Sequence, residues 1–189
     1  MVLPGHLAGG YIATSIILNF VSIPLSSTDL SVIYTIGILS GEIPDIDLLL
    51  FYFEKNKNKH KNRQTHRDFI THIPLFWFVF CLTIFFIGFL ATSKFIMLLS
   101  VVILAGTFSH FILDSLEYGI QWFKPFSKRR YCLFEIKEME SFERRSQHDH
   151  VKIGSLRFYW NYVTTIYIKQ VSFYAELLIV IIALIMIFW

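Results

Sequence analysis

Long apolar stretches separated by short polar segments dominate the chain. A bilayer core about 30 Å thick needs about 20 mostly apolar residues in a helix. Pro44, with acidic residues beside it, should interrupt the second stretch, because proline removes a backbone donor and clashes with the preceding turn. The pattern therefore predicts an all-α, multi-pass transmembrane helical bundle of about five spans. The expected spans are residues 7–23, 30–53, 73–91, 95–116 and 171–189.

A long polar stretch, residues 126–170, lies before the last apolar one. It mixes charged residues with Tyr and Phe, as a small cytoplasmic or interfacial segment would, since aromatic rings favour the membrane–water boundary. We therefore divide the chain into a four-helix membrane domain at residues 1–125, this segment, and a C-terminal transmembrane helix at residues 171–189.

The composition supports a membrane protein. Hydrophobic residues make up 54% of the 189 residues and charged residues only 16%. Because soluble domains carry about a quarter charged residues, this composition excludes a disordered chain and argues against an ordinary water-soluble domain. Cys81 and Cys132 lie in unrelated contexts, so a disulfide framework or a cysteine zinc site has no support. No basic residue precedes the first apolar stretch, so we expect a first span there rather than a cleaved signal peptide.

The distribution of positive charge orients the predicted bundle. Sixteen of the seventeen Lys and Arg residues fall in residues 54–67 and 124–169, which alternating spans place on one side. The positive-inside rule assigns that side to the cytoplasm, with the N-terminus inside and the C-terminus outside. The basic run at residues 55–67 is best explained by topology and attraction to anionic lipid head groups. We expect membrane lipid, and no nucleic acid, as its partner.

Ionisable side chains gather where the predicted helices end on the cytoplasmic side. Such groups are costly in or near a membrane and usually serve a function. Four predicted helix ends deliver imidazole and carboxylate groups to one layer, a convergence that chance does not readily produce. The set comprises His6, Glu42, Asp45, Asp47, His66, Asp68, His72, His110 and Asp114.

The spacing of these residues is typical of metal ligands. His110 and Asp114 are four residues apart, so a helix places them on one face. Mixed imidazole and carboxylate ligands suit Zn²⁺ best here, with Mn²⁺ or Fe²⁺ as alternatives. The number of ligands allows one or two ions. The predicted ligands are His6, Asp45, Asp47, His66, His72, His110 and Asp114.

Structural explanations remain open for individual members of this set. His110 and Asp114 alone would serve equally well as a hydrogen-bonded pair between helices. Asp45 and Asp47 alone would more often end a helix at the interface. Glu117, near Asp114, is either a partner of the ligands or part of the surface. Only the joint pattern favours a metal.

Several short motifs carry a family resemblance. In chain order they are Gly5-His6-Leu7, Ile43-Pro44-Asp45-Ile46-Asp47, the stretch from His66 to His72, Ser109-His110 with Asp114, and Pro125-Phe126-Ser127. Together they resemble the membrane-bound metal-dependent hydrolases of domain-of-unknown-function family 457, which include a LexA-regulated inner-membrane protein. The likeness spans roughly residues 5–131. Leu48 stands where many relatives place a His, and Asp68 stands near the family's Gly.

The resemblance implies metal-assisted hydrolysis. Its ligand order is similar to that of zinc-dependent phospholipase C, which implies a phosphoester of a lipid or lipid-linked substrate at the cytoplasmic face. In that reaction Glu42 or Asp68 would act as general base, and Arg67 would pair with a substrate phosphate.

Two other functions remain as alternatives. One is a non-catalytic membrane subunit whose structural metal or His/Asp cluster binds a partner complex. The other is metal transport, which we rank last because the third and fourth predicted helices offer only Thr83 and Ser100 in their middles.

Overall fold

The computed structural model describes residues 3–47, 69–117, 119–134 and 156–189, and its regular elements are all helical within these ranges. This confirms the predicted all-α class. The longer helices are α1 (Leu3–Phe20), α2 (Ser27–Ser40), α4 (Pro74–Leu90), α5 (Lys94–Asp114), α7 (Leu156–Thr165) and α8 (Val171–Phe188). The short 3₁₀ helices within these ranges are η1 (Ile43–Ile46), η3 (Ile70–His72) and η4 (Tyr167–Lys169).

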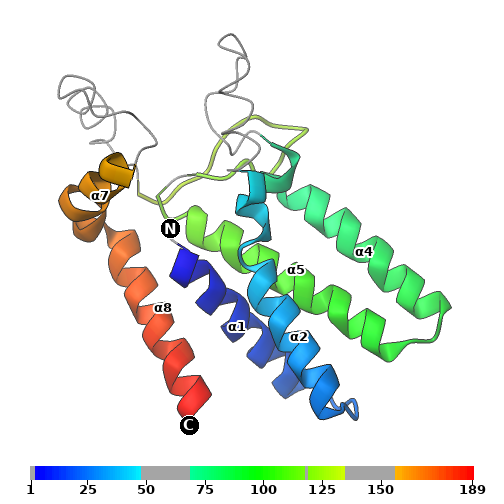
Figure 1. Cartoon of the computed structure of the whole chain (residues 1–189). Coiled ribbons are helices and arrows are strands. Elements are labelled where there is room, and N and C mark those ends of the chain that lie inside the picture. Colours follow the sequence, from blue (N-terminus) through cyan, green and yellow to red (C-terminus); the bar gives the residue numbers. More distant parts are fainter. Residues whose placement is uncertain (1–2, 48–68, 118, 135–155) are drawn as a thin grey trace.

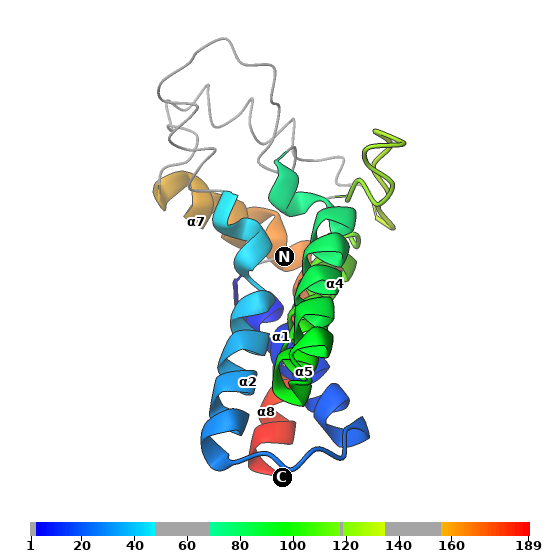
Figure 2. The same ribbon diagram turned by 90° about the vertical axis from the view of Figure 1, so that its right-hand side faces the viewer.

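The bundle consists of α1, α2, α4, α5 and α8, which lie side by side (Figures 1 and 2). α1 packs against α2, α5 and α8, while α4 packs on the other side of α5. The start of α1 and the end of α5 lie at one end of the bundle, and the C-terminal end of α8 lies at the other (Figure 1). α7 lies at the same end as the start of α8.

Small residues allow α1, α2 and α5 to approach closely. A methyl group added at Gly10 of α1 would lie 2.5 Å from the carbonyl oxygen of Gly37 in α2. A methyl group at Gly106 of α5 would lie 2.8 Å from the same oxygen. Both distances are too short for a real contact, so these positions require glycine, as is common where membrane helices pack.

The predicted interruption of the second apolar stretch is confirmed. α2 ends at Ser40, and after Gly41 the chain tightens into η1, whose first turn contains Pro44. Because Pro44 cannot continue the α-helix, the backbone winds into the separate, tighter turn of η1 at the end of the bundle. Asp45 therefore leaves the line of α2 and turns toward the neighbouring helices.

The prediction of about five membrane spans needs correction. By length and hydropathy, the described residues contain two helices that could cross a membrane, α5 and α8, while α4 is apolar but shorter. α2 has only 14 residues because the chain breaks before Pro44, and it therefore rises about 21 Å. α1 has 18 residues, but His6, Thr14 and Asn19 lower its hydropathy.

Two carboxylates attach α8 to the rest of the bundle. Glu117, just after α5, is buried and accepts hydrogen bonds from the Ser172 backbone at 3.0 Å and hydroxyl at 2.5 Å. Glu176 is also buried and accepts the Gly5 backbone N–H at 2.9 Å and the Tyr167 hydroxyl. α8 is therefore fixed by buried polar contacts to the elements around the candidate site.

Candidate metal centre

Four separate elements place the candidate ligands at one end of the bundle. His6 lies in the first turns of α1, Asp45 in η1, His72 in η3, and His110 with Asp114 in the last turn of α5. The three histidines and Asp114 are buried, and Asp45 is half-buried. The fold therefore gathers groups that are up to 108 positions apart in the chain (residues 6 and 114).

The short helix η3 owes its position to a tryptophan. The indole N–H of Trp77, in the first turn of α4, donates to the carbonyl oxygen of Thr71 at 2.7 Å. Trp77 is itself buried in a cluster with Phe111 and Ile120. Because η3 is thus tied to α4, His72 is carried to the same place as His110.

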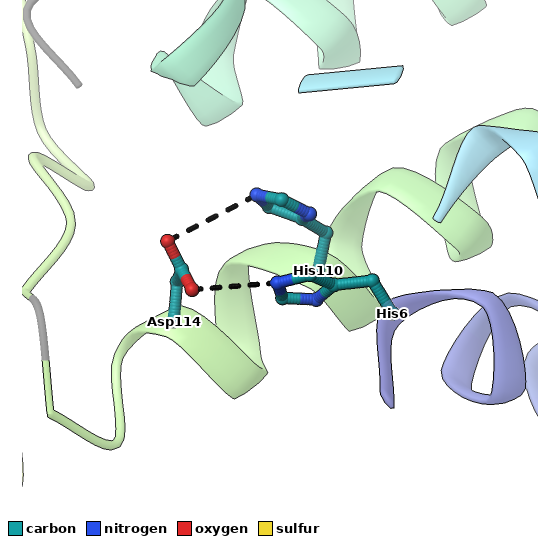
Figure 3. A group of neighbouring side chains, drawn as sticks. All are labelled: His6, His110 and Asp114. Carbon is teal, nitrogen blue, oxygen red and sulfur yellow. Dashed lines mark ion pairs between the residues drawn. The ribbon is translucent and has the colours of Figure 1, made fainter. Parts of the chain in front are cut away.

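One group of candidate ligands consists of His6, His110 and Asp114 (Figure 3). The Nε2 atom of His6 lies 3.5 Å from one oxygen of Asp114, and the Nε2 atom of His110 lies 4.0 Å from the other. The two imidazole rings stack with their centroids 4.0 Å apart. One ligand atom from each residue lies within 4.8 Å of the other two.

A second group consists of Asp45, His72 and His110, so the two groups share His110. The same oxygen of Asp45 lies 3.4 Å from Nε2 of His72 and 3.8 Å from Nε2 of His110. The two Nε2 atoms are 3.4 Å apart. Three potential ligand atoms thus surround one point.

The other ring nitrogen of two histidines is held by an acceptor. Nδ1 of His110 lies 2.9 Å from the carbonyl oxygen of Gly41, and Nδ1 of His72 lies 2.5 Å from Asp47. Since a carbonyl and a carboxylate can only accept, each Nδ1 carries the proton. In the neutral rings, both Nε2 atoms therefore present lone pairs to the same point. Metal-binding histidines are oriented by their second nitrogen in this way.

This arrangement of acceptors fits a divalent metal ion. Two nitrogens bound at about 2.1 Å to one tetrahedral Zn²⁺ lie about 3.4 Å apart, which matches the separation of the two Nε2 atoms. The two ring nitrogens of His6 are buried with no hydrogen-bond partner among the described residues. A proton on His72 would satisfy Asp45, but it would leave Nδ1 of His6 without a hydrogen-bond partner among the described residues.

The charges around the centre alter two carboxyl groups. Burial, then the carboxylates of Asp45 and Asp114, raise the pKa of Glu42 to about 7. Burial alone would also raise the pKa of Asp45, but His72 and His110 outweigh it and hold that pKa below its usual range. The centre is therefore dense in carboxylates, and a cation would relieve their repulsion.

The structure brings five of the seven predicted ligands into the two groups. Asp47 is buried behind His72, where it also accepts the Thr71 hydroxyl at 2.6 Å, and it belongs to neither group. Glu42 lies beside η1 with one buried oxygen that has no hydrogen-bond partner among the described residues. The remaining predicted site residues, His66, Arg67 and Asp68, lie outside the described residues.

Sequence reasoning missed the groups that support the ligands. The Gly41 carbonyl and the Thr71 hydroxyl left no recognisable pattern, because such groups occur throughout any chain. Glu176 did leave a signal, since it is an acidic residue within an apolar stretch. Glu117, for which two roles were open, is buried and binds the start of α8.

Comparison with known proteins gives one result. No curated protein and no solved structure matches this chain. All of its residues, 1–189, match the family described as YdjM inner membrane protein. Since the match covers the whole chain, the protein belongs to the YdjM inner membrane protein family.

Proposed function

We propose that this protein is a membrane-embedded, metal-dependent hydrolase that cleaves a phosphoester of a lipid or lipid-linked substrate at the cytoplasmic face. One observation carries the proposal. The Nε2 atoms of His72 and His110 face each other at 3.4 Å beside Asp45, with both Nδ1 atoms held by acceptors. Facing lone pairs repel unless a cation lies between them.

The membrane part of the proposal rests on the family and on the surface of the helices. The family is described by its place in the inner membrane. α4 exposes large apolar side chains along its length, such as Phe78, Leu82 and Phe89, and exposed patches of this kind mark membrane contact. We propose that α5 and α8, the two described helices that are long and apolar enough to cross a membrane, span the bilayer, with the apolar surface of α4 against lipid beside α5. The skew of Lys and Arg supports a cytoplasmic position for the candidate centre.

In this proposal the five clustered residues hold one or two divalent ions, with Zn²⁺ preferred over Mn²⁺ or Fe²⁺. The bound metal would lower the pKa of a water molecule and offset negative charge on a phosphate. The protein orients the ligands through Asp47 and the Gly41 carbonyl. Glu42, the described carboxylate beside η1, is proposed as general base with Asp68 as the alternative, and Arg67 keeps its predicted role toward the substrate phosphate.

The substrate class follows from the depth of the centre. It lies at the ends of α1 and α5 rather than in the middle of either helix. In a bilayer this is the depth of the lipid head groups, where a phosphoester is found. Basic residues follow Asp47 at residues 55–67 and follow Asp114 at residues 124–130, which favours an anionic substrate.

An assay with defined lipids tests the proposal. Protein purified in detergent is incubated with phospholipids or lipid pyrophosphates and Zn²⁺ or Mn²⁺. We expect turnover by the wild type and none by His110→Ala. Glu42→Gln should retain metal but lose roughly 100-fold or more in rate, as expected for a general base. Equal turnover by the wild type and His110→Ala would remove the proposed site.

Burial of the centre favours a second candidate function. His6, His72 and His110 are all buried, as the ligands of a structural metal would be. The protein would then be a non-catalytic membrane subunit whose cluster joins α1, α5, η1 and η3 for a partner complex. Alanine variants separate the two functions. An enzyme loses activity and stays assembled, whereas a structural cluster loses folded protein as well.

A further inference from the structure

The segment after α5, residues 119–134, is folded as an ordered loop. Ile120 and Tyr131 exchange backbone hydrogen bonds of 3.1 and 3.0 Å, which close the loop at its base. The Leu133 N–H then donates to the carbonyl oxygen of Ser115 at 2.9 Å. Since Ser115 directly follows Asp114, the loop is fixed to the helix end that carries two candidate ligands.

The base of the loop shares a core with the candidate centre. Ile120 is buried in one cluster with Trp77 and Phe111. The ring of Phe111 contacts the rings of His110 and His72 edge-on, with centroids 5.7 and 6.3 Å apart. The position of the loop is therefore coupled to the position of the candidate ligands through the packing of Ile120 on Phe111.

Large apolar side chains are exposed both within the loop and at its base, beside Tyr131. Phe126 is 88% exposed, Leu133 73% and Phe123 58%. Side chains of this size in one short segment cost free energy when they face water, and they are typical of a surface that meets a membrane or a partner.

Positive charge surrounds these apolar side chains. Residues 119–134 contain Lys124, Lys128, Arg129 and Arg130 and no acidic residue. Lys128 and Arg129 are exposed. The Arg129 guanidinium lies 5.4 Å from the centre of the Tyr131 ring, a contact that favours both groups. Aromatic side chains interleaved with Lys and Arg are suited to a membrane–water interface with anionic lipid.

The loop also lies in the right place for such a contact. It projects sideways from the end of the bundle, beyond α4 and α5 (Figure 2). With α5 across the bilayer, that position is the head-group layer on the side of the candidate centre. A lateral projection there lies along the membrane surface.

We propose that residues 119–134 form a membrane-surface anchor that binds the anionic phospholipids of the leaflet beside the candidate centre. Phe123, Phe126 and Leu133 enter the boundary between head groups and acyl chains. Lys128 and Arg129 pair with the lipid phosphates. This inference requires α5 to cross the bilayer, but it does not require hydrolase activity.

The native cysteines allow a direct test. Cys132 is exposed in the loop, whereas Cys81 is buried in α4. A nitroxide on Cys132 of the full chain in lipid nanodiscs reports its depth through collision with oxygen, which concentrates in lipid, or with a nickel complex, which stays in water. Cys132→Ser gives the background signal. The discs contain phosphatidylcholine alone or mixed with phosphatidylglycerol.

In the mixed discs we expect oxygen collisions to exceed nickel collisions at Cys132. Reversal of charge in a Lys128→Glu, Arg129→Glu variant should raise nickel collisions several-fold, and so should Phe126→Ser. All three side chains are exposed, so helix content should not change. A label that is as open to nickel in mixed discs as a label in solution would overturn the proposal and leave the loop for a protein partner. If the depth of the Cys132 label changed neither with charge reversal nor with added phosphatidylglycerol, the proposed binding of anionic lipid would be overturned.

Discussion

The two ring nitrogens of His72, and likewise those of His110, have different tasks at the candidate centre. Nδ1 of His72 is held by Asp47, and Nε2 of the same ring faces Asp45 and His110. The acceptor therefore sets the direction in which the ligand atom points. A group that binds the second nitrogen of a metal-binding histidine fixes the orientation of the ring, and its loss typically weakens metal binding.

Asp47→Ala tests this division of tasks. Loss of the carboxylate frees His72 to rotate, so we expect metal affinity to fall by about 10- to 100-fold. Competition with a chromophoric zinc chelator measures the change. Thr71→Ala, which leaves the contact between Asp47 and His72 in place, is the matched control and should have a smaller effect. Equal affinities for the wild type and Asp47→Ala would show that Asp47 does not orient the ligand.

Gly41 combines two roles at a single residue. Its carbonyl oxygen accepts from His110, and a methyl group at its Cα would overlap the carbonyl oxygen of His6. Gly41→Ala should therefore displace both histidines, at a cost of about 1–3 kcal/mol in stability, and abolish metal binding. Gly88 lies near the end of α4 that is far from the candidate centre, and Gly88→Ala would also crowd a helix contact. This control variant should lose stability without losing metal binding. Thermal unfolding and metal content are measured for both variants. Equal metal content in Gly41→Ala and Gly88→Ala would contradict the role of Gly41 at the centre.

At the level of single residues, the sequence predicts which side chains gather at the candidate centre better than it predicts the groups that hold them. His6, His110 and Asp114 could be selected because an ionisable group near a membrane is costly. Asp47 was predicted as a ligand, but its spacing from Asp45 cannot tell which carboxylate faces the centre. That choice depends on the turn of η1, which only the three-dimensional structure shows.

At the scale of elements, α8 is joined to the bundle by Glu176. Its two oxygens accept from the Gly5 backbone and the Tyr167 hydroxyl. Glu176→Leu would leave both buried donors without an acceptor, which costs about 1–3 kcal/mol for each donor. We expect a lower unfolding temperature in detergent and faster hydrogen exchange at the start of α1. Tyr167→Phe keeps the contact with Gly5, so it should lose less. An unchanged unfolding temperature in Glu176→Leu would contradict this role.

Element boundaries could be predicted where proline and hydropathy agree. The break before Pro44 and the ranges of α4 and α5 follow from the sequence pattern to within a few residues. The number of spans could not be predicted in this way. Hydropathy does not show where a helix stops in space, and α2 stops at Ser40 because the chain turns there toward η1.

At the scale of the whole molecule, the loop between α4 and α5 and the loop after α5 lie at opposite ends of the bundle (Figure 1). We expect a membrane-impermeant thiol reagent to modify Cys132 faster in inverted membrane vesicles than in intact spheroplasts. Thr92→Cys in a Cys132→Ser background should show the reverse pattern, because Thr92 joins α4 to α5 and is exposed. Modification of Cys132 from outside the cell would place the candidate centre in the periplasm.

The cluster of candidate ligands depends on assembly of the whole molecule. Candidate ligands from α1, η1, η3 and α5 meet only when the complete bundle is assembled. A bound metal would therefore stabilise the folded protein, because it binds the native state and not the unfolded chain. Chelation should lower the unfolding temperature of the wild type and leave that of His110→Ala unchanged.

Elemental analysis of the detergent-purified protein tests the central claim most directly. The wild type should contain one or two divalent ions per chain, chiefly zinc, whereas His110→Ala should retain its helix content and contain almost none, because His110 belongs to both ligand groups. Wild-type protein that contains no more metal than His110→Ala, even after incubation with Zn²⁺ and removal of excess ions, would contradict the metal centre.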